Sequence, residues 1–228
     1  MTLSGPRDVG LRLAAGSLDQ EENPWPPATS SVNNEAARAI TDAWTEAERQ
    51  VGKTTSQAPE VRPARIEDVP AMARVHVRSW QQTYRGLMRD EILDDPSFVA
   101  RRERLWTAAL SDERYAKHRT AVAEHCGQIV GIAMAGPPTA DDSSLAAHLY
   151  VLYLLEDHHG SGAGTELLEA VIGPAESASL WVADPNPRAQ AFYRKHGFRP
   201  DGTYRVDDGV REIRMSRNGT DRQAPSSS

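Results

Sequence analysis

Cysteine is almost absent from this chain, because its 228 residues include only Cys126. A single thiol cannot form an internal disulfide, and no group of cysteines and histidines has the spacing of a zinc site. No apolar run approaches the roughly 18 residues that a membrane-spanning helix needs. The N-terminus also lacks the basic head and apolar stretch of a signal peptide. We therefore expect a protein of the reducing cytoplasm.

A basic excess is missing as well. The chain carries 26 Lys and Arg against 32 Asp and Glu, which gives a formal net charge of -6 at pH 7. Proteins that bind nucleic acids or anionic membranes usually carry the opposite balance. We expect neither kind of partner, whereas an apolar content of 39% with five tryptophans is enough for a folded core.

Regular patterns are lacking at both ends of the chain. The first 32 residues include the stretch "ENPWPPATSS", whose prolines and serines exclude a regular element, so we predict a disordered tail over 1–32. The last residues, 218–228, predict a second tail. The main domain is expected to cover 59–217, after a separate segment at 33–58.

That separate segment has a helical pattern. Apolar side chains recur at three- and four-residue spacing, which predicts an amphipathic helix over 33–51 followed by a linker; they are Ala36, Ile40, Ala43, Trp44, Ala47 and Val51. We expect its stripe to pack against the main domain or against a second copy of the chain. The second arrangement would make the protein a homodimer.

Strand and helix patterns alternate through the main domain. In order, we predict a short strand at 60–65, helices at 66–86 and 96–110, a hairpin at 120–136 that turns at Cys126–Gly127, a strand at 146–155, a helix at 165–173, a strand at 178–184, a helix at 187–197 and a closing hairpin around 207–209. Such a succession predicts an α/β fold with a mixed sheet.

The stretch "HHGSGAGTELLEAV" places three glycines directly before a helix. A P-loop would need Gly-Lys where this chain has Thr165 and Glu166, and a dinucleotide fingerprint would need a third glycine at Thr165 or Leu167. The pattern that fits is Q/R-x-x-G-x-G/A, read from His159 to Gly164 with histidine in the first position. A flexible turn between strand and helix is the alternative.

Bare backbone at a helix start suits a pyrophosphate. Free N–H groups there point outward at the positive end of the helix dipole. Each N–H bond to a charged oxygen is worth about 1.5–3 kcal/mol, against roughly 0.3–1 kcal/mol from the dipole. The N–H donors therefore contribute more to pyrophosphate binding than the helix dipole does. Side chains at these positions would block the approach of the pyrophosphate to the backbone.

Two longer stretches resemble the GNAT N-acetyltransferase superfamily. "LYVLYLLEDHHGSGAGTELL" resembles its acetyl-CoA signature, and "LWVADPNPRAQAFYRKHGF" resembles its N-x-x-A-x-x-F-Y-x-x-x-G-F segment, with Asn186 and Tyr193 in register. "RSWQQTYRGL" and "EIRMSR" are similar to one branch. The resemblance covers about residues 60–217, and the first 59 residues have no counterpart in it.

The resemblance implies a mixed, mostly antiparallel sheet that is splayed at the acetyl-CoA site and flanked by helices. It implies transfer of an acetyl group from acetyl-CoA directly to a primary amine of a small molecule or peptide, without an acyl-enzyme. A non-catalytic acetyl-CoA-binding regulatory module is the alternative. No third ligand is spaced to join His158 and His159, so we expect no metal. The residues it assigns to the cosubstrate are Leu154, Glu156, His159, Gly160, Ser161, Gly162, Ala163, Gly164, Thr165, Asn186 and Tyr193. Glu156 stands where the family often has proline, and His159 replaces the usual Gln or Arg.

Two side chains are our candidates for the chemistry. An alkylamine has a pKa of about 10.4, so roughly one molecule in 10³ is neutral at pH 7, and a general base helps. We predict that Tyr193 protonates the leaving thiolate and that His148 is the base. Strand alternation would place His148, Tyr150 and Leu154 on one face if no bulge intervenes. The alternatives are a packed helix tyrosine and a strand-edge histidine.

Other polar and aromatic residues have two readings each. Asn186 before a proline is a good helix N-cap, which is compatible with a cosubstrate contact. Trp80 and Tyr84 end the first helix, which borders the acceptor groove in the family, so we predict that they bind the acceptor or else pack in the core. Asp207 and Asp208 would attract a cationic acceptor or simply form an exposed turn.

Overall fold

The structure is a computed structural model that describes residues 58–138, 144–207 and 209–219. The predicted tail at 1–32, the predicted helix at 33–51 and most of the predicted C-terminal tail lie outside the described residues. Asp208 lies outside them as well.

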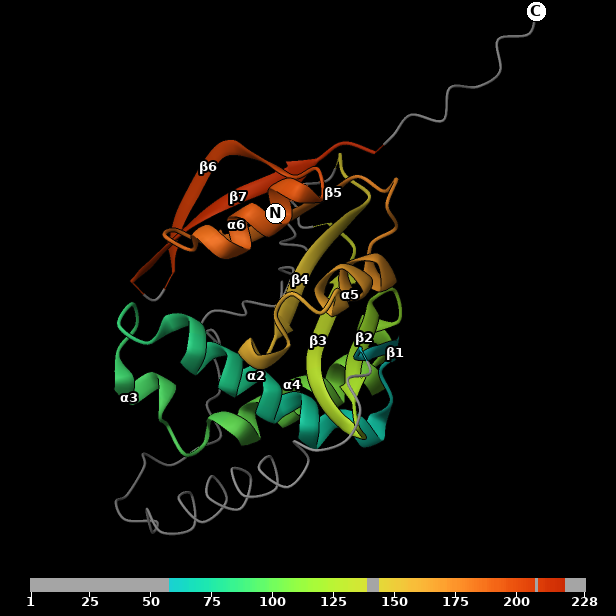
Figure 1. Cartoon of the computed structure of the whole chain (residues 1–228), viewed down its shortest axis with the longest axis vertical. Coiled ribbons are helices and arrows are strands. Elements are labelled where there is room, and N and C mark those ends of the chain that lie inside the picture. The colour runs from blue at the N-terminus through green and yellow to red at the C-terminus, as the bar shows by residue number, and fades with distance from the viewer. Residues whose placement is uncertain (1–57, 139–143, 208, 220–228) are drawn as a thin grey trace, which may run out of the picture. The chain divides into compact units, whose positions relative to one another are not determined.

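A seven-stranded sheet with the order β1-β2-β3-β4-β5-β7-β6 forms the centre of the domain (Figure 1). Its strands are β1 (Glu60–Pro63), β2 (Arg119–His125), β3 (Gln128–Gly136), β4 (Ala147–Leu154), β5 (Ala178–Ala183), β6 (Arg199–Asp207) and β7 (Val210–Arg217). Only β4 and β5 are parallel, and every other pair is antiparallel. The predicted mixed, mostly antiparallel sheet is confirmed.

The described residues form five α-helices: α2 (Val69–Tyr84), α3 (Asp90–Leu93), α4 (Phe98–Ser111), α5 (Ala163–Val171) and α6 (Pro187–Lys195). Short 3-10 helices occupy Ile66–Asp68, Glu113–Tyr115 and Glu156–His158. The sequence missed α3, which is a single turn. The predicted start of α5 at Thr165 is two residues late. The prediction assigned Gly164 to the loop, but Gly164 lies in the first turn of the helix, where backbone N–H groups have no partner within the helix.

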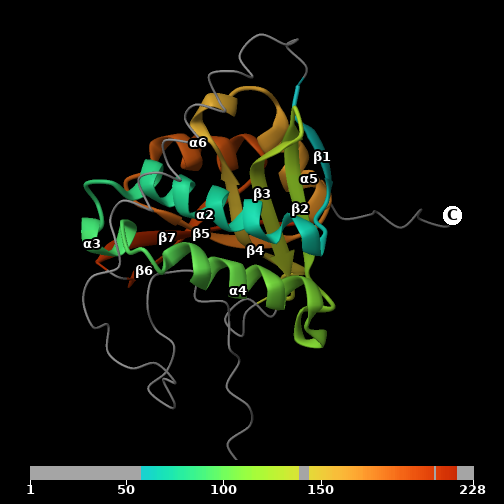
Figure 2. The same ribbon diagram turned by 90° about the horizontal axis from the view of Figure 1, so that it is seen from below.

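The register of the sheet shows which helices cover which face. Gly131 pairs with Leu154, and a Cβ on Gly131 would lie 2.9 Å from Leu167 of α5. The next β4 residue, Tyr153, points to the opposite face, where its ring lies 5.1 Å from that of His76 in α2. Helix α5 therefore covers one face, and α2, packed against α4, covers the other (Figure 2).

The core lies mainly between the sheet and α2 and α4. Trp106 of α4 is 0% exposed, as are Met72 and Leu93. On the other face, Leu167, Leu168, Val171 and Ile172 are buried. None of the helices in the described ranges has the length and apolar character needed to cross a membrane.

Candidate active site

The parallel pair β4 and β5 separates partway along its length. The strands pair only from Ala147 to Leu149 on β4 and from Ala178 to Leu180 on β5, although β4 continues to Leu154. Both strands are described in full, so their carboxyl ends diverge and leave a gap in the sheet (Figure 1). The backbone of β4 beyond residue 149 has no strand partner on that side.

Backbone groups of Leu154 face this gap. The N–H of Leu155 donates to the carbonyl of Val130 on β3 at 2.9 Å, and successive residues of a strand point their backbone groups to opposite sides. The N–H and C=O of Leu154 therefore point away from β3. His159 Nε2 lies 2.8 Å from the Leu154 oxygen, which leaves the Leu154 N–H directed at the gap.

The expected placement of His148, Tyr150 and Leu154 on one face required that no bulge intervene, but β4 contains one, so His148 and Leu154 lie on opposite faces. Ala135 pairs with Leu149, and the adjacent Met134 pairs with Val151, so Tyr150 is an extra residue. The alternation changes phase at a bulge. A sequence count with period two cannot detect this insertion, since no glycine or proline marks it.

The structure places His148 in the joined part of the sheet, between Gly136 on β3 and Ser179 on β5. Its side chain is 4% exposed, and Nδ1 lies 2.7 Å from Ser179 Oγ. The ring therefore has a buried partner before β4 and β5 separate. Its assignment as the general base stays a prediction.

The glycine segment forms an open cradle before α5. Gly160 and Gly162 have φ of 83° and 95°, and a Cβ at either position would meet nothing within 4 Å. Within the described ranges, the N–H groups of Gly160, Gly162 and Gly164 donate to no other group. Open space beside several unpaired donors would suit a pyrophosphate, and this assignment stays a prediction.

His159 connects this loop to two other elements. Its Nε2 donates to the Leu154 oxygen at the end of β4, and its Nδ1 accepts from Arg188 of α6 at 2.6 Å. These partners require a neutral ring, and burial, aided by the charge of Arg188, holds the pKa of His159 below its usual value. Histidine thus holds the loop in place where the family usually has Gln or Arg.

Helices α5 and α6 are also joined directly, by Thr165 and His196. The Thr165 hydroxyl lies 3.1 Å from His196 Nε2, and His196 Nδ1 donates to the carbonyl of Phe192 at 2.9 Å. A Cβ on Gly164 would lie 3.4 Å from the Phe192 ring. The predicted site residues Gly164 and Thr165 therefore set how closely the two helices approach, on the same face of the sheet.

Three other predicted cosubstrate residues make hydrogen bonds within their own segments. Asn186 Oδ1 accepts from the N–H of Ala189 at 3.1 Å, which confirms the helix cap. Ser161 is exposed, and its Oγ accepts from the N–H of Ala163 at 3.3 Å. Glu156 is exposed, and its carbonyl accepts from the N–H of His159 at 2.9 Å.

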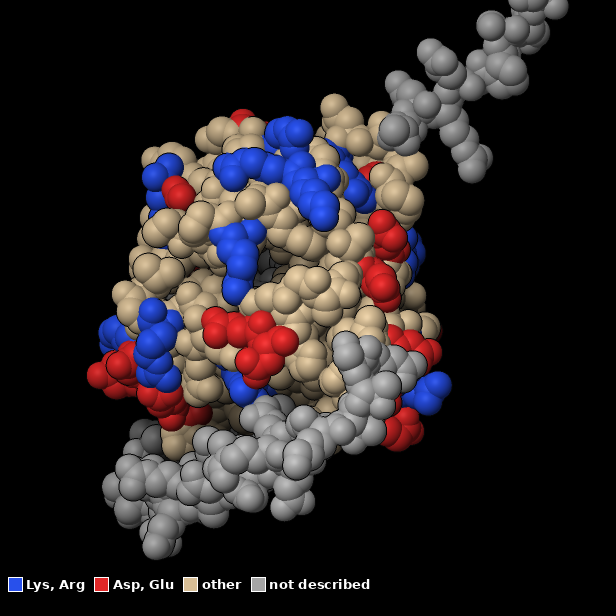
Figure 3. All heavy atoms as spheres, viewed as in Figure 1, with Lys and Arg blue, Asp and Glu red and all other residues tan. Residues whose placement is uncertain are grey.

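The molecular surface is hollowed between α6 and the loop that precedes α5 (Figure 3). Lys and Arg side chains lie on the α6 side of this hollow (Figure 3). Helix α6 carries exposed Arg188, Arg194 and Lys195. Basic side chains beside an N–H cradle suit a ligand with several phosphates.

Aromatic side chains from three elements meet at the gap. Trp80 Nε1 donates to Tyr153 Oη at 2.9 Å, and the Tyr84 ring packs edge-on against Trp80, with 5.3 Å between the ring centroids. Tyr193 reaches the gap from α6, and its hydroxyl interacts electrostatically with those of Tyr153 and Tyr84. Burial raises the pKa of all three tyrosines, so all three keep their protons at neutral pH.

Sequence reasoning missed two residues of this site, Tyr153 and Arg188. Tyr153 lies in an apolar stretch that indicates only a buried strand, and its neighbours on α2 are distant in the sequence. Arg188 follows the helix-capping Asn186 and has the ordinary appearance of an exposed helix residue. Only their contacts, with Trp80 and with His159, indicate a role in the site.

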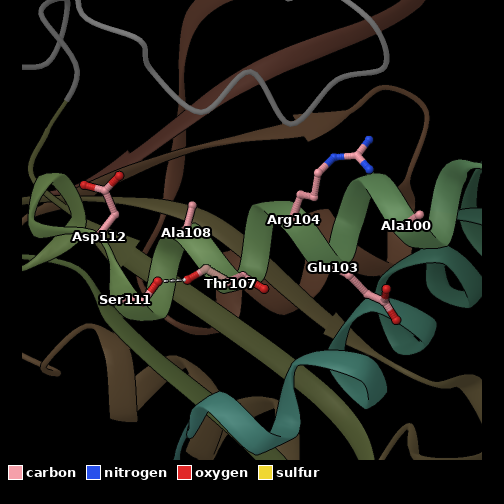
Figure 4. Close-up of a pocket in the computed structure, with 7 residues that line it drawn as sticks. All are labelled: Ala100, Glu103, Arg104, Thr107, Ala108, Ser111 and Asp112. Carbon is pink, nitrogen blue, oxygen red and sulfur yellow. Dashed lines mark hydrogen bonds between the residues drawn. The ribbon is translucent and has the colours of Figure 1, made fainter. Parts of the chain in front are cut away.

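A separate shallow depression runs along the outer face of α4 (Figure 4). Its lining residues are Ala100, Glu103, Arg104, Thr107, Ala108, Ser111 and Asp112. They lie on one helix and its end, and the residues of the gap are not among them. Across the described part of the chain, no three His, Cys, Asp or Glu residues are grouped to hold a metal ion.

Comparison with known proteins agrees with this geometry. The sequence model of the acetyltransferase (GNAT) family matches residues 77–198. A probable N-acetyltransferase of Mycobacterium tuberculosis is 29% identical over 146 residues, which is 62% of this chain and 80% of that protein. The uncharacterized N-acetyltransferase YuaI of Bacillus subtilis is 30% identical over 141 residues, 60% of this chain and 78% of YuaI.

Two solved structures share the fold. PaiA N-acetyltransferase of Thermoplasma acidophilum, in complex with coenzyme A, has a TM-score of 0.55 at 21% identity, covering 71% of this chain and 99% of PaiA. A histone acetyltransferase HPA2-related protein of Corynebacterium glutamicum has a TM-score of 0.54 at 22% identity, covering 74% of this chain and 100% of that protein.

Proposed function

Because this chain belongs to the acetyltransferase (GNAT) family, we propose that it moves the acetyl group of acetyl-CoA directly to a primary amine of a small molecule or peptide. It is an acyltransferase by family. The observation that carries the proposal is the separation of β4 from β5 beside an open N–H cradle. The gap between the strands would accept the extended pantetheine arm of acetyl-CoA, and the N–H groups would bind its pyrophosphate.

The residues present fit acetyl-CoA. The N–H groups of Gly160, Gly162 and Gly164 would hold the pyrophosphate, and the Leu154 N–H would bind the pantetheine arm in the gap. The basic residues of α6 suit the remaining phosphate. The structural neighbour PaiA was crystallised with coenzyme A, which supports the same cosubstrate here.

The cosubstrate and the acceptor approach the gap from opposite faces of the sheet. Tyr193 comes from α6, on the cosubstrate side, and donates the proton that the leaving thiolate takes up. Its raised pKa, caused by burial, keeps the hydroxyl protonated until then. Tyr84 and Trp80 come from α2 on the other side, where we place the acceptor. Trp80 is 2% exposed and hydrogen-bonded to Tyr153, so it contributes mainly by holding Tyr153 in place.

A screen for thiol release tests this function. The full chain would be incubated with acetyl-CoA and, separately, n-butylamine, phenethylamine, spermidine, L-lysine, hydroxylamine or a peptide with a free N-terminus. We expect thiol release above the amine-free rate with at least one acceptor. Binding of acetyl-CoA without turnover of any amine would instead support a non-catalytic acetyl-CoA-binding module.

The role of His148 is tested by His148→Ala. Loss of a general base would depress the rate most near neutral pH and least at high pH, where the amine deprotonates itself. Because His148 is buried and bonded to Ser179, we expect instead a loss that is independent of pH and accompanied by a lower Tm. Ser179→Ala is the matched control and should lower Tm in the same way. A pH-dependent loss confined to His148→Ala would restore the general base assignment.

A further inference from the structure

Glu212 lies at the open end of the gap, on the acceptor side. It pairs with Ala183, the last residue of β5, across the β5–β7 ladder. Two residues earlier on the same strand, Val210 packs in a cluster with Val77 and Trp80 of α2. Residues two apart on a strand share a face, so Glu212 also faces α2, opposite α5 and α6.

The Glu212 carboxylate is mostly buried, with 14% of its side chain exposed. Burial raises its pKa, although the hydrogen-bonded Arg205 opposes the shift and Asp207 adds to it. Its charge also raises the pKa values of Tyr84 and Tyr153, after the larger effect of burial, so it lies near both phenols. The charged and titratable groups that act on Glu212 or on these two phenols include Arg205 and Asp207 of β6, Arg102 of α4 and Tyr193 of α6, and Arg214 of β7 lies on the same face as Glu212.

Arg205 engages only one oxygen of this carboxylate. Its Nε and Nη2 lie 2.7 and 2.6 Å from Oε2 of Glu212, and its guanidinium is held over the Trp181 ring at 4.4 Å. Within the described part of the chain, Oε1 of Glu212 accepts no hydrogen bond. This arrangement fixes the orientation of the carboxylate and leaves Oε1 available to a ligand.

We propose that Oε1 of Glu212 binds the ammonium group of the acceptor and takes its proton before the amine attacks acetyl-CoA. This inference rests on the proposed function and adds to it a substrate class, a cationic primary amine. The acceptor approaches along the α2 face, between the carboxylate and the rings of Tyr84 and Tyr153. Aromatic faces beside a carboxylate favour a cation.

The proton balance of the reaction is complete with these residues. Glu212 takes one proton from R–NH3+, and the neutral nitrogen forms a bond to the acetyl carbon. The C–S bond then breaks, and the thiolate takes the proton of Tyr193. The resulting tyrosinate removes the surplus proton of the new amide nitrogen, and Glu212 releases its proton to solvent. The products are the acetamide, free thiol and one proton.

Glu212→Gln tests the proposal, since glutamine keeps the size of the side chain and the bond to Arg205 but is not basic. With n-butylamine at pH 7, kcat/KM should fall at least tenfold. With hydroxylamine, which is already neutral at this pH, the loss should be less than threefold. Glu212→Asp keeps a base and should give an intermediate rate with n-butylamine, so it extends the test if the first variant folds poorly.

Arg205→Gln is the matched control, because it removes the other half of the ion pair. The base works as a carboxylate, so the rate falls as pH falls through the pKa of Glu212. Arg205 favours the charged form and lowers that pKa. Its removal should therefore move the acidic limb of the pH–rate profile to higher pH.

Two results would overturn the assignment of Glu212 alone. One is an equal loss with n-butylamine and hydroxylamine in Glu212→Gln. The other is that Glu212→Gln and Arg205→Gln both lower Tm but leave the rate and its pH profile unchanged, which would make the pair purely structural. If the wild-type chain releases thiol with no amine of the screen, the proposed function fails, and this inference fails with it.

Discussion

Replacing Tyr193 with phenylalanine is expected to lower kcat about 10- to 100-fold and to leave the affinity for acetyl-CoA almost unchanged. The change removes only the hydroxyl, because the ring stays packed against Phe192 and Phe198. The loss corresponds to about 1.4–2.7 kcal/mol of transition-state stabilisation. Steady-state kinetics on an amine found by the screen measures kcat, and calorimetry measures the affinity.

Tyr204→Phe is the matched control for this experiment. Tyr204 lies on the edge strand β6 with 63% of its surface exposed, so the same chemical change there should alter neither quantity. If Tyr193→Phe keeps full turnover and shifts stability by only a fraction of a kcal/mol, Tyr193 is a core residue and the thiolate finds its proton elsewhere.

Replacing Gly162 with valine is expected to weaken acetyl-CoA binding at least tenfold. A side chain at this position would project into open space, which the account assigns to the pyrophosphate. The backbone φ of 95° also disfavours any β-branched residue, so the N–H donors beside it would shift. Titration calorimetry with acetyl-CoA gives the dissociation constants of the variant and the wild type.

Gly202→Val separates the effect of a side chain in the pyrophosphate space from the effect of backbone strain. Gly202 lies on β6 with φ of 92°, and a Cβ there would also meet nothing within 4 Å. This control therefore carries similar backbone strain away from the cradle, and it should lose stability while retaining acetyl-CoA binding. A folded Gly162→Val protein with wild-type affinity would show that the pyrophosphate binds elsewhere.

The local elements of the site could be predicted from the sequence because each depends on residues that are close in the chain. Gly160 and Gly162 adopt positive φ directly before α5, and Asn186 caps α6 through its own side chain. Short-range conformational preferences decide both features. The family resemblance then supplied the correct arrangement of the sheet.

The features that the sequence could not predict depend on distant segments. The bulge at Tyr150 appears only in the pairing of β4 with β3, and it changes which residues share a face with His148. Glu212 is a second example. In "VREIRMSR" the apolar Ile213 and Met215 predict the buried face, yet Val210 and Glu212 face α2, because the hairpin of β6 and β7 has helices on both sides of its base.

Product analysis with acetyl-CoA deuterated in its acetyl group tests the central claim most directly. The wild-type chain and an amine from the screen would react until the thiol released could be quantified, and mass spectrometry would then measure the acetamide. We predict one deuterated acetamide for each thiol and no acetylated protein, because the transfer is direct. Thiol release with free acetate and no acetamide, or a stable acetyl group on the protein that later reaches the amine, would contradict the account.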